Sequence, residues 1–124
     1  MVATPVHIAL VDDDESVRRA LSRLLSVLGF EVSAFASAEE FLVSGNLERA
    51  ACMVLDVHLP RLSGLELKSL LAIASRSVPV VFITGDDEMA RSDEMLRTGA
   101  RCLMKPLERD QLVAAIHDAV GVVH

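Results

Sequence analysis

Basic residues, long apolar segments and cysteines are all scarce in this sequence, and each shortage excludes a class of protein. The 124 residues include 12 Lys and Arg but 18 Asp and Glu, a net charge of −6. This balance disfavours direct binding of nucleic acid, because a phosphate backbone requires a basic surface. No apolar run approaches the roughly 20 residues that a membrane-spanning helix needs, so we expect no membrane insertion.

The two cysteines, Cys52 and Cys102, both lie inside apolar runs. A cysteine in such a run behaves more often as a small buried hydrophobic residue than as half of a disulfide or as a metal ligand. This usage fits a reducing compartment, and we therefore expect a cytoplasmic location.

The sequence is organised around the short apolar run 53–55, which ends in Asp56 and is followed by Pro60 and Gly64. The run is typical of a buried strand, and the Pro and Gly are typical of the loop that leaves it. Asp56 should then lie at the carboxyl end of a central strand, where open α/β sheets bind their ligands. Hydrophobic residues make up 52% of the chain, and the length predicts one domain over residues 1–124.

Short apolar runs alternate with helical periodicity along the whole chain. Strands are predicted at residues 7–11, 31–35, 52–55, 78–83 and 101–104. Apolar residues at helical spacing predict a helix after each strand, the fourth over residues 88–98 and the last over residues 108–120. A capping-box pattern at Ser37 and Glu40 predicts the start of the second helix. The helix 88–98 has the most irregular apolar pattern, so we expect low local stability there.

Alternating strands and helices indicate βαβ units with right-handed crossovers. The predicted fold is α/β, a doubly wound five-stranded parallel sheet of (βα)5 type with the flavodoxin-like strand order 2-1-3-4-5. This order places the first, third and fourth strands side by side. Their carboxyl ends bring Asp12, Asp13, Asp56 and Thr84 together, and Lys105 arrives from the fifth strand.

Three carboxylates at one edge of a sheet repel one another. At about 4 Å, two unit charges cost roughly 4 kcal/mol at an effective dielectric constant near 20, so either one group is protonated or a cation neutralises them. Carboxylate oxygens select hard cations such as Mg²⁺. With the ammonium of Lys105 and the hydroxyl of Thr84, such a cation would form a phosphoryl site in which Asp56 becomes an aspartyl phosphate.

Two neighbouring residues have simpler interpretations. His58 follows Asp56 closely, and because Mg²⁺ prefers oxygen ligands, its backbone carbonyl is a better candidate ligand than its imidazole. Asp14 is expected only to cap the helix that follows the first strand.

These residues give the chain a clear resemblance to the receiver domain of two-component response regulators. The matching marks are Asp12-Asp13, Asp56 with Leu59-Pro60 and Gly64 behind it, Thr84-Gly85 and Lys105-Pro106, and the match runs from residue 7 to residue 120. The segments 37–42 and 83–85 are most similar to FixJ-type receivers.

The resemblance implies a role for each acidic residue. Asp56 would accept a phosphoryl group from the histidine of a sensor kinase or of a phosphotransfer protein. Asp13, Asp56 and the backbone carbonyl of His58 would bind Mg²⁺, and Asp12 would assist through water. The protein would not be an enzyme, beyond the chemistry of its own phosphorylation and dephosphorylation.

The resemblance also implies how the signal is passed on. Thr84 would close on the phosphoryl group, Lys105 would pair with it, and the Lys105–Pro106 bond would be cis. Phosphorylation would switch the face formed by residues 88–98, 101–104 and 108–120. That face would contact a protein output partner or an effector domain, or would form a homodimer.

Two departures from the receiver pattern affect transmission rather than phosphate capture. Cys102 occupies the position where receivers usually carry a Phe or Tyr switch residue, and a cysteine is too small to act as an aromatic latch. The spacing between Thr84 and Lys105 is also slightly short. The charge of Asp86, close after Thr84, is a further candidate for altering the lifetime of the phosphoryl group.

Three other interpretations stay open at this point. A haloacid-dehalogenase-type phosphatase would also form an aspartyl phosphate, and Asp12 to Asp14 contain its Asp-x-Asp; however, its nucleophile follows the first strand and its lysine precedes its late acidic motif. A flavodoxin-like FMN carrier requires a phosphate-binding loop where this chain has three acids. A receiver-like scaffold that no longer accepts phosphate would retain the same fold.

Overall fold

The computed structural model describes residues 5–74 and 78–121. One parallel sheet contains β1 (His7–Val11), β2 (Glu31–Phe35), β3 (Cys52–Asp56), β4 (Val80–Thr84) and β5 (Arg101–Met104). The strands lie in the order β2-β1-β3-β4-β5, which confirms the predicted fold class and strand order. Only β4 starts later than expected, at Val80, because Pro79 has no N–H to donate to a neighbouring strand.

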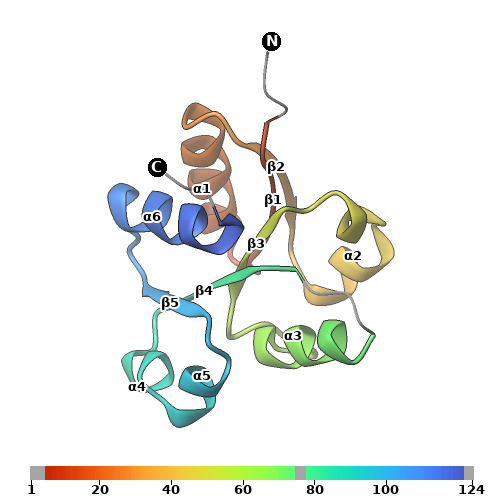
Figure 1. Cartoon of the computed structure of the whole chain (residues 1–124), viewed down its shortest axis with the longest axis vertical. Coiled ribbons are helices and arrows are strands. Elements are labelled where there is room, and N and C mark those ends of the chain that lie inside the picture. Colours follow the sequence, from red (N-terminus) through yellow and green to blue (C-terminus); the bar gives the residue numbers. More distant parts are fainter. Residues whose placement is uncertain (1–4, 75–77, 122–124) are drawn as a thin grey trace.

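Helices cover both faces of the sheet (Figure 1). One face is covered by α1 (Glu15–Val27) and α6 (Arg109–Val120), and the other by α2 (Ala38–Val43), α3 (Gly64–Ile73) and α5 (Asp93–Arg97). A short 3₁₀ helix, Asn46–Glu48, precedes β3. Within the described residues, no helix combines the length and the apolar character needed to cross a membrane.

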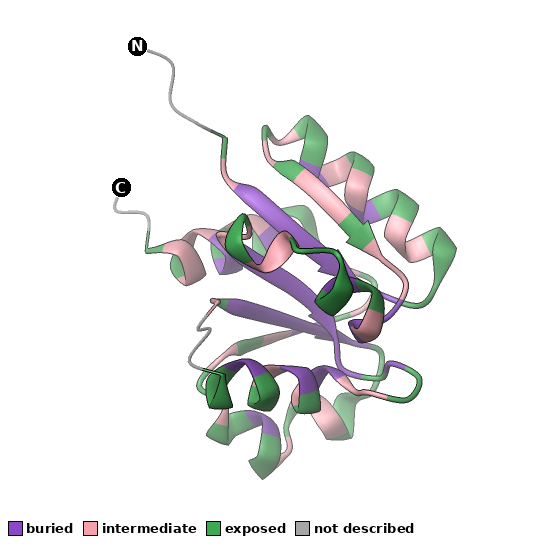
Figure 2. Cartoon of the chain, turned by 90° about the vertical axis from the view of Figure 1, so that its right-hand side faces the viewer, coloured by how far each residue is buried: buried purple, intermediate pink, exposed green. Residues whose placement is uncertain are grey.

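The central strands supply side chains to two separate hydrophobic clusters. In β1, Ile8 and Leu10 pack with α1 and α6, whereas Ala9 and Val11 pack with α2 and α3. Every residue of β1, β3 and β4 is buried (purple in Figure 2). This burial on both faces is typical of parallel strands, and it holds the carboxyl ends of these three strands in fixed positions.

Side-chain caps fix the starts of α1, α2 and α3. Asp14 accepts hydrogen bonds from the backbone N–H groups of Ser16 and Val17 and caps α1 as predicted. The hydroxyl of Ser37 accepts from Glu40 N at the start of α2. A reciprocal capping box begins α3 at Ser63 and Glu66. It was not predicted from the sequence.

The prediction of one helix over residues 88–98 was wrong. The segment is divided into α4 (Asp87–Ala90) and α5 (Asp93–Arg97). The hydroxyl of Ser92 donates to the carbonyl of Met89 and accepts from the N–H of Met95, so it satisfies backbone groups that a continuous helix would pair internally. Five helical segments were expected to alternate with the strands, and this break divides the fourth of them.

Candidate functional site

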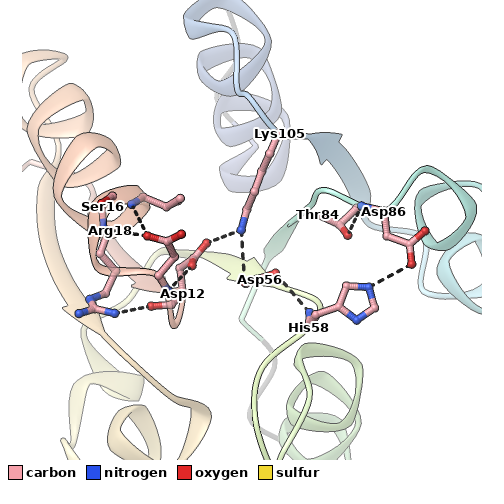
Figure 3. Close-up of polar contacts among 10 residues, drawn as sticks. Asp12, Ser16, Arg18, Asp56, His58, Thr84, Asp86 and Lys105 are labelled. Atoms are coloured by element: carbon pink, nitrogen blue, oxygen red, sulfur yellow. Dashed lines mark hydrogen bonds and ion pairs between the residues drawn. The ribbon is translucent and has the colours of Figure 1, made fainter.

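The carboxyl ends of β1, β3, β4 and β5 meet at one edge of the sheet. Val11 pairs with Leu55, Asp56 with Ile83, and Thr84 with Met104 in the strand register. Figure 3 shows the polar side chains that this register brings together, with Asp56 at the centre, Asp12 on the side of α1 and Thr84 on the side of α4. The expected meeting of these residues is therefore observed.

Three carboxylates form the acidic part of the site. Asp12 is fully buried, Asp56 is 4% exposed, and Asp13 is exposed. One oxygen from each of the three lies within 4.8 Å of the others. Oxygen ligands at this separation fit a hard divalent cation, so the donor set of the described structure is compatible with the expected metal.

Lys105 joins two of these carboxylates. Its Nζ lies 2.8 Å from Asp12 Oδ2 and 3.3 Å from Asp56 Oδ2. Burial alone would lower the pKa of Lys105, but the hydrogen bond with Asp12 and the negative charges of Asp56 and Asp12 outweigh it and raise the pKa above its ordinary value. The ammonium group therefore stays charged and partly neutralises the acidic cluster.

The carboxyl group of Asp56 is in an unfavourable position for a charge. Burial and the nearby charge of Asp12 raise its pKa above the ordinary value, while Lys105 and the N–H of His58 act in the opposite direction. That N–H donates to Asp56 Oδ1 at 3.2 Å. Ionisation of this buried carboxyl group costs free energy, and a bound cation would offset that cost.

Backbone contacts hold Asp12 in place. The N–H of Asp14 donates to Asp12 Oδ1 at 2.9 Å, and the guanidinium of Arg18 donates to the Asp12 carbonyl at 2.8 Å. The N–H of Asp12 in turn donates to the carbonyl of Phe35 at 3.1 Å. Arg18 is partly buried, and its role could not be predicted from the sequence, because nothing in the helical pattern of α1 distinguishes it from the exposed Arg19 and Arg23.

Gly64 has a structural role that its place in a loop did not reveal. A Cβ atom at this position would lie 2.4 Å from the carbonyl oxygen of Asp56 and 3.1 Å from Val57 Cα. The start of α3 thus packs directly against the backbone of Asp56, and only glycine permits this approach.

Thr84, Asp86 and His58 form the opposite side of the site. Thr84 is fully buried, and its Oγ1 accepts a hydrogen bond from Asp86 N at 3.0 Å. The carboxylate of Asp86 lies 3.4 Å from Nε2 of His58. Only the tertiary structure reveals this last contact, because it joins two loops that are distant in the sequence.

Cys102 lies on β5 next to Phe82 of β4. It is half-buried against the hydrophobic cluster to which α2 and α3 contribute. Burial raises the pKa of its thiol. Cys52 is fully buried, and both cysteines are free. Each therefore acts as a small packing residue, as predicted. The Lys105–Pro106 bond is cis, also as predicted.

A scan against protein-family models matches residues 8–117 to the response regulator receiver domain. The chain belongs to this family. Its match is to a signalling domain of two-component systems and not to an enzyme family. The match weighs against the phosphatase, whose nucleophile follows the first strand. It also weighs against the flavodoxin-like carrier, whose phosphate-binding loop would stand where this chain has three acids.

Individual relatives agree with the family match. The receiver is 38% identical over 115 residues to nodulation protein W of Bradyrhizobium diazoefficiens, an alignment that covers 92% of this chain and 51% of that protein. The response regulator StyR superposes with a TM-score of 0.86 at 37% identity, covering 96% of this chain and 61% of the StyR chain.

The crystal structure of FixJ-N superposes with a TM-score of 0.83 at 31% identity over 98% of both chains. This likeness confirms the FixJ-type character. The chain thus spans about half the length of nodulation protein W and nearly all of the FixJ-N structure.

Proposed function

We propose that Asp56 is the phosphoacceptor of this receiver and that the reaction depends on Mg²⁺. An oxygen of the Asp56 carboxylate would bond to phosphorus as the phosphorus–nitrogen bond of a phosphohistidine breaks, and the donor histidine would leave. The observation that carries the proposal is the position of Asp56, held between Lys105 Nζ and His58 N in a cluster with Asp12 and Asp13.

The other residues of the site have supporting roles in this proposal. Asp13, Asp56 and the backbone carbonyl of His58 would bind Mg²⁺, with Asp12 assisting through water. When bound, the metal would neutralise charge on the phosphoryl oxygens. Lys105 would pair with one of those oxygens, and the hydroxyl of Thr84 would donate to another. Phosphorylation and later hydrolysis of the aspartyl phosphate are the only chemistry proposed for the chain.

The proposal includes partners and context. A sensor histidine kinase or a phosphotransfer protein would supply the phosphoryl group in the cytoplasm. The whole chain, residues 1–124, would act as a single receiver. The face of α4, α5, β5 and α6 would change on phosphorylation and contact an output protein or an effector domain, or form a homodimer. Low apolar content at α4 and α5 supports this, since Met95 is the one residue of these helices that is buried.

Intact mass spectrometry tests the proposal directly. After incubation with Mg²⁺ and acetyl phosphate, the protein should gain one phosphoryl group, and it should gain none when EDTA is present or when Asp56→Asn is used. Asp110→Asn is the matched control, because it removes an exposed carboxylate from the first turn of α6 and should leave phosphorylation unchanged.

The result also separates the receiver from a scaffold that does not accept phosphate. An adduct that persists in Asp56→Asn would contradict the assignment of the acceptor. If neither acetyl phosphate nor a phosphorylated histidine kinase modifies the protein, the scaffold interpretation would replace the proposal.

A further inference from the structure

Polar contacts join five residues in a closed ring around the candidate site, and Figure 3 draws the links that run from Lys105 through Asp56, His58 and Asp86 to Thr84. The N–H of His58 donates to Asp56 Oδ1 at 3.2 Å, and the imidazole of His58 lies 3.4 Å from Asp86 Oδ2. The N–H of Asp86 donates to Thr84 Oγ1 at 3.0 Å, and the carbonyl of Thr84 accepts from Lys105 N at 2.8 Å. Lys105 Nζ closes the ring at 3.3 Å from Asp56 Oδ2.

The links of this ring differ in exposure. Thr84 is fully buried and Asp56 almost so, and Lys105 has 24% of its side chain exposed. The side chains of His58 and Asp86 are 54% and 46% exposed. Their contact is also the only link of the ring that joins two side chains from the loop after β3 and the turn after β4. Breaking this contact should therefore cost less free energy than breaking any other link of the ring.

Asp86 connects this contact to two other parts of the molecule. Its Oδ1 accepts from Met89 N and caps α4, while its backbone N–H holds the hydroxyl oxygen of Thr84. A change in the position of Asp86 must therefore move the start of α4 and alter the orientation of Thr84 together. His58, in the loop after β3, contacts Asp86 from the side of Asp56.

We propose that the His58 side chain and Asp86 are positioning residues, and that their contact holds Thr84 and the start of α4 in register with Asp56. This inference rests on the proposed function, since it assigns Thr84 a contact with the phosphoryl group. Preorganised donors raise rates because they need no reorganisation during the reaction. Loss of the contact leaves the reacting atoms in place and frees the segment that carries Thr84.

Two substitutions remove the contact and preserve its surroundings. His58→Ala retains the backbone N–H that binds Asp56 and the carbonyl proposed as a metal ligand. Asp86→Ser retains an oxygen for the cap of α4, because Ser caps helices about as well as Asp. Asp87→Ser is the matched control, since Asp87 is exposed on the same turn and pairs with Arg91 rather than with His58.

Phosphorylation by acetyl phosphate, followed by intact mass, gives the first measurement. We expect His58→Ala and Asp86→Ser each to slow the reaction about two- to five-fold, the range that an exposed pair can produce. The double variant should be no slower than the slower single variant, and Asp87→Ser should be unchanged. In a Thr84→Ala background, His58→Ala should have no further effect, because the contact acts through Thr84.

Hydrogen exchange of residues 84–90 gives a second measurement that needs no phosphorylation. Exchange should rise in both single variants and in the double variant to the same extent. If the wild-type protein accepts no phosphoryl group yet shows this pattern, the proposed function fails and the structural role of the contact stands. Effects of the two substitutions that multiply in the double variant, or that persist in Thr84→Ala, would overturn the inference.

Discussion

The two sides of Asp56 are built in different ways. On one side, Asp12 leads into α1, a continuous helix of 13 residues that buries Leu21 and Leu25; we call residues 12–28 the Asp12 wall. On the other side, Thr84 leads into α4 and α5, helices of 4 and 5 residues that bury Met95; we call residues 84–98 the Thr84 wall.

The difference between the walls matches two requirements of a receiver. A cluster of buried carboxylates needs fixed partners, and the Asp12 wall supplies them through the backbone contacts of Asp12 and the packing of α1. The signalling surface proposed above would need segments with low local stability, and the Thr84 wall has short helices joined at Ser92. A long, well-buried helix and two short, sparsely buried helices thus lie on opposite sides of the same carboxylate.

Deleting one buried side chain from each wall should give the largest contrast. Leu25→Ala removes a fully buried residue of α1 and should lower the free energy of unfolding by about 2–5 kcal/mol. Met95→Ala should lower it by about 2 kcal/mol, because α5 can open locally, and should raise hydrogen exchange over residues 84–98. Urea unfolding and exchange mass spectrometry measure both effects. The contrast between the walls would not hold if both variants lost the same free energy of unfolding and Met95→Ala showed no local opening.

Ser92 lies at the junction of α4 and α5 within the Thr84 wall. Ser92→Ala removes the hydroxyl that bonds Met89 and Met95 and should cost about 0.5–2 kcal/mol, the usual range for a lost cap. Ser69→Ala, at an exposed position within α3, is the control and should change stability by less than about 0.5 kcal/mol. Urea unfolding compares them. A stabilised Ser92→Ala variant would indicate that α4 and α5 join into the single helix expected from sequence.

The pH dependence of stability should report the charge of Asp56, which lies beside the Asp12 wall. We expect this effect to be smaller than those of the substitutions above. Burial and Asp12 raise the pKa of Asp56, so the native state holds this proton more tightly than the unfolded chain does. Stability is therefore lost as pH rises from the ordinary carboxyl pKa, about 4, to the raised native value, and the loss persists at higher pH.

Asp56→Asn removes this ionisation. The variant should melt a few degrees above the wild type at pH 7, and the gain should shrink as pH falls toward 4. Thermal melts at several pH values measure it, with Asp110→Asn as the control. A gain that is independent of pH would show that the charge of Asp56 is not its cause.

The amino-acid sequence alone predicts the sheet and identifies the polar residues at its edge. Continuous apolar runs predict strands buried on both faces, and parallel strands must end at the same edge, so Asp12, Asp13, Asp56, Thr84 and Lys105 could be placed together without coordinates. The amphipathic pattern of α1 and the cap at Asp14 could also be predicted from the sequence, because both depend on residues within a few positions of one another.

The contacts between loops could not be predicted from the sequence, because they depend on tertiary packing. The bridge of Lys105 to both Asp12 and Asp56, the approach of Gly64 to the Asp56 backbone and the contact of His58 with Asp86 join residues from different strand ends. The break at Ser92 was also missed, since a weak apolar stripe leaves helix continuity to competing side-chain hydrogen bonds. Local periodicity determines which segments form, whereas the distances between their ends depend on how the whole sheet twists and packs.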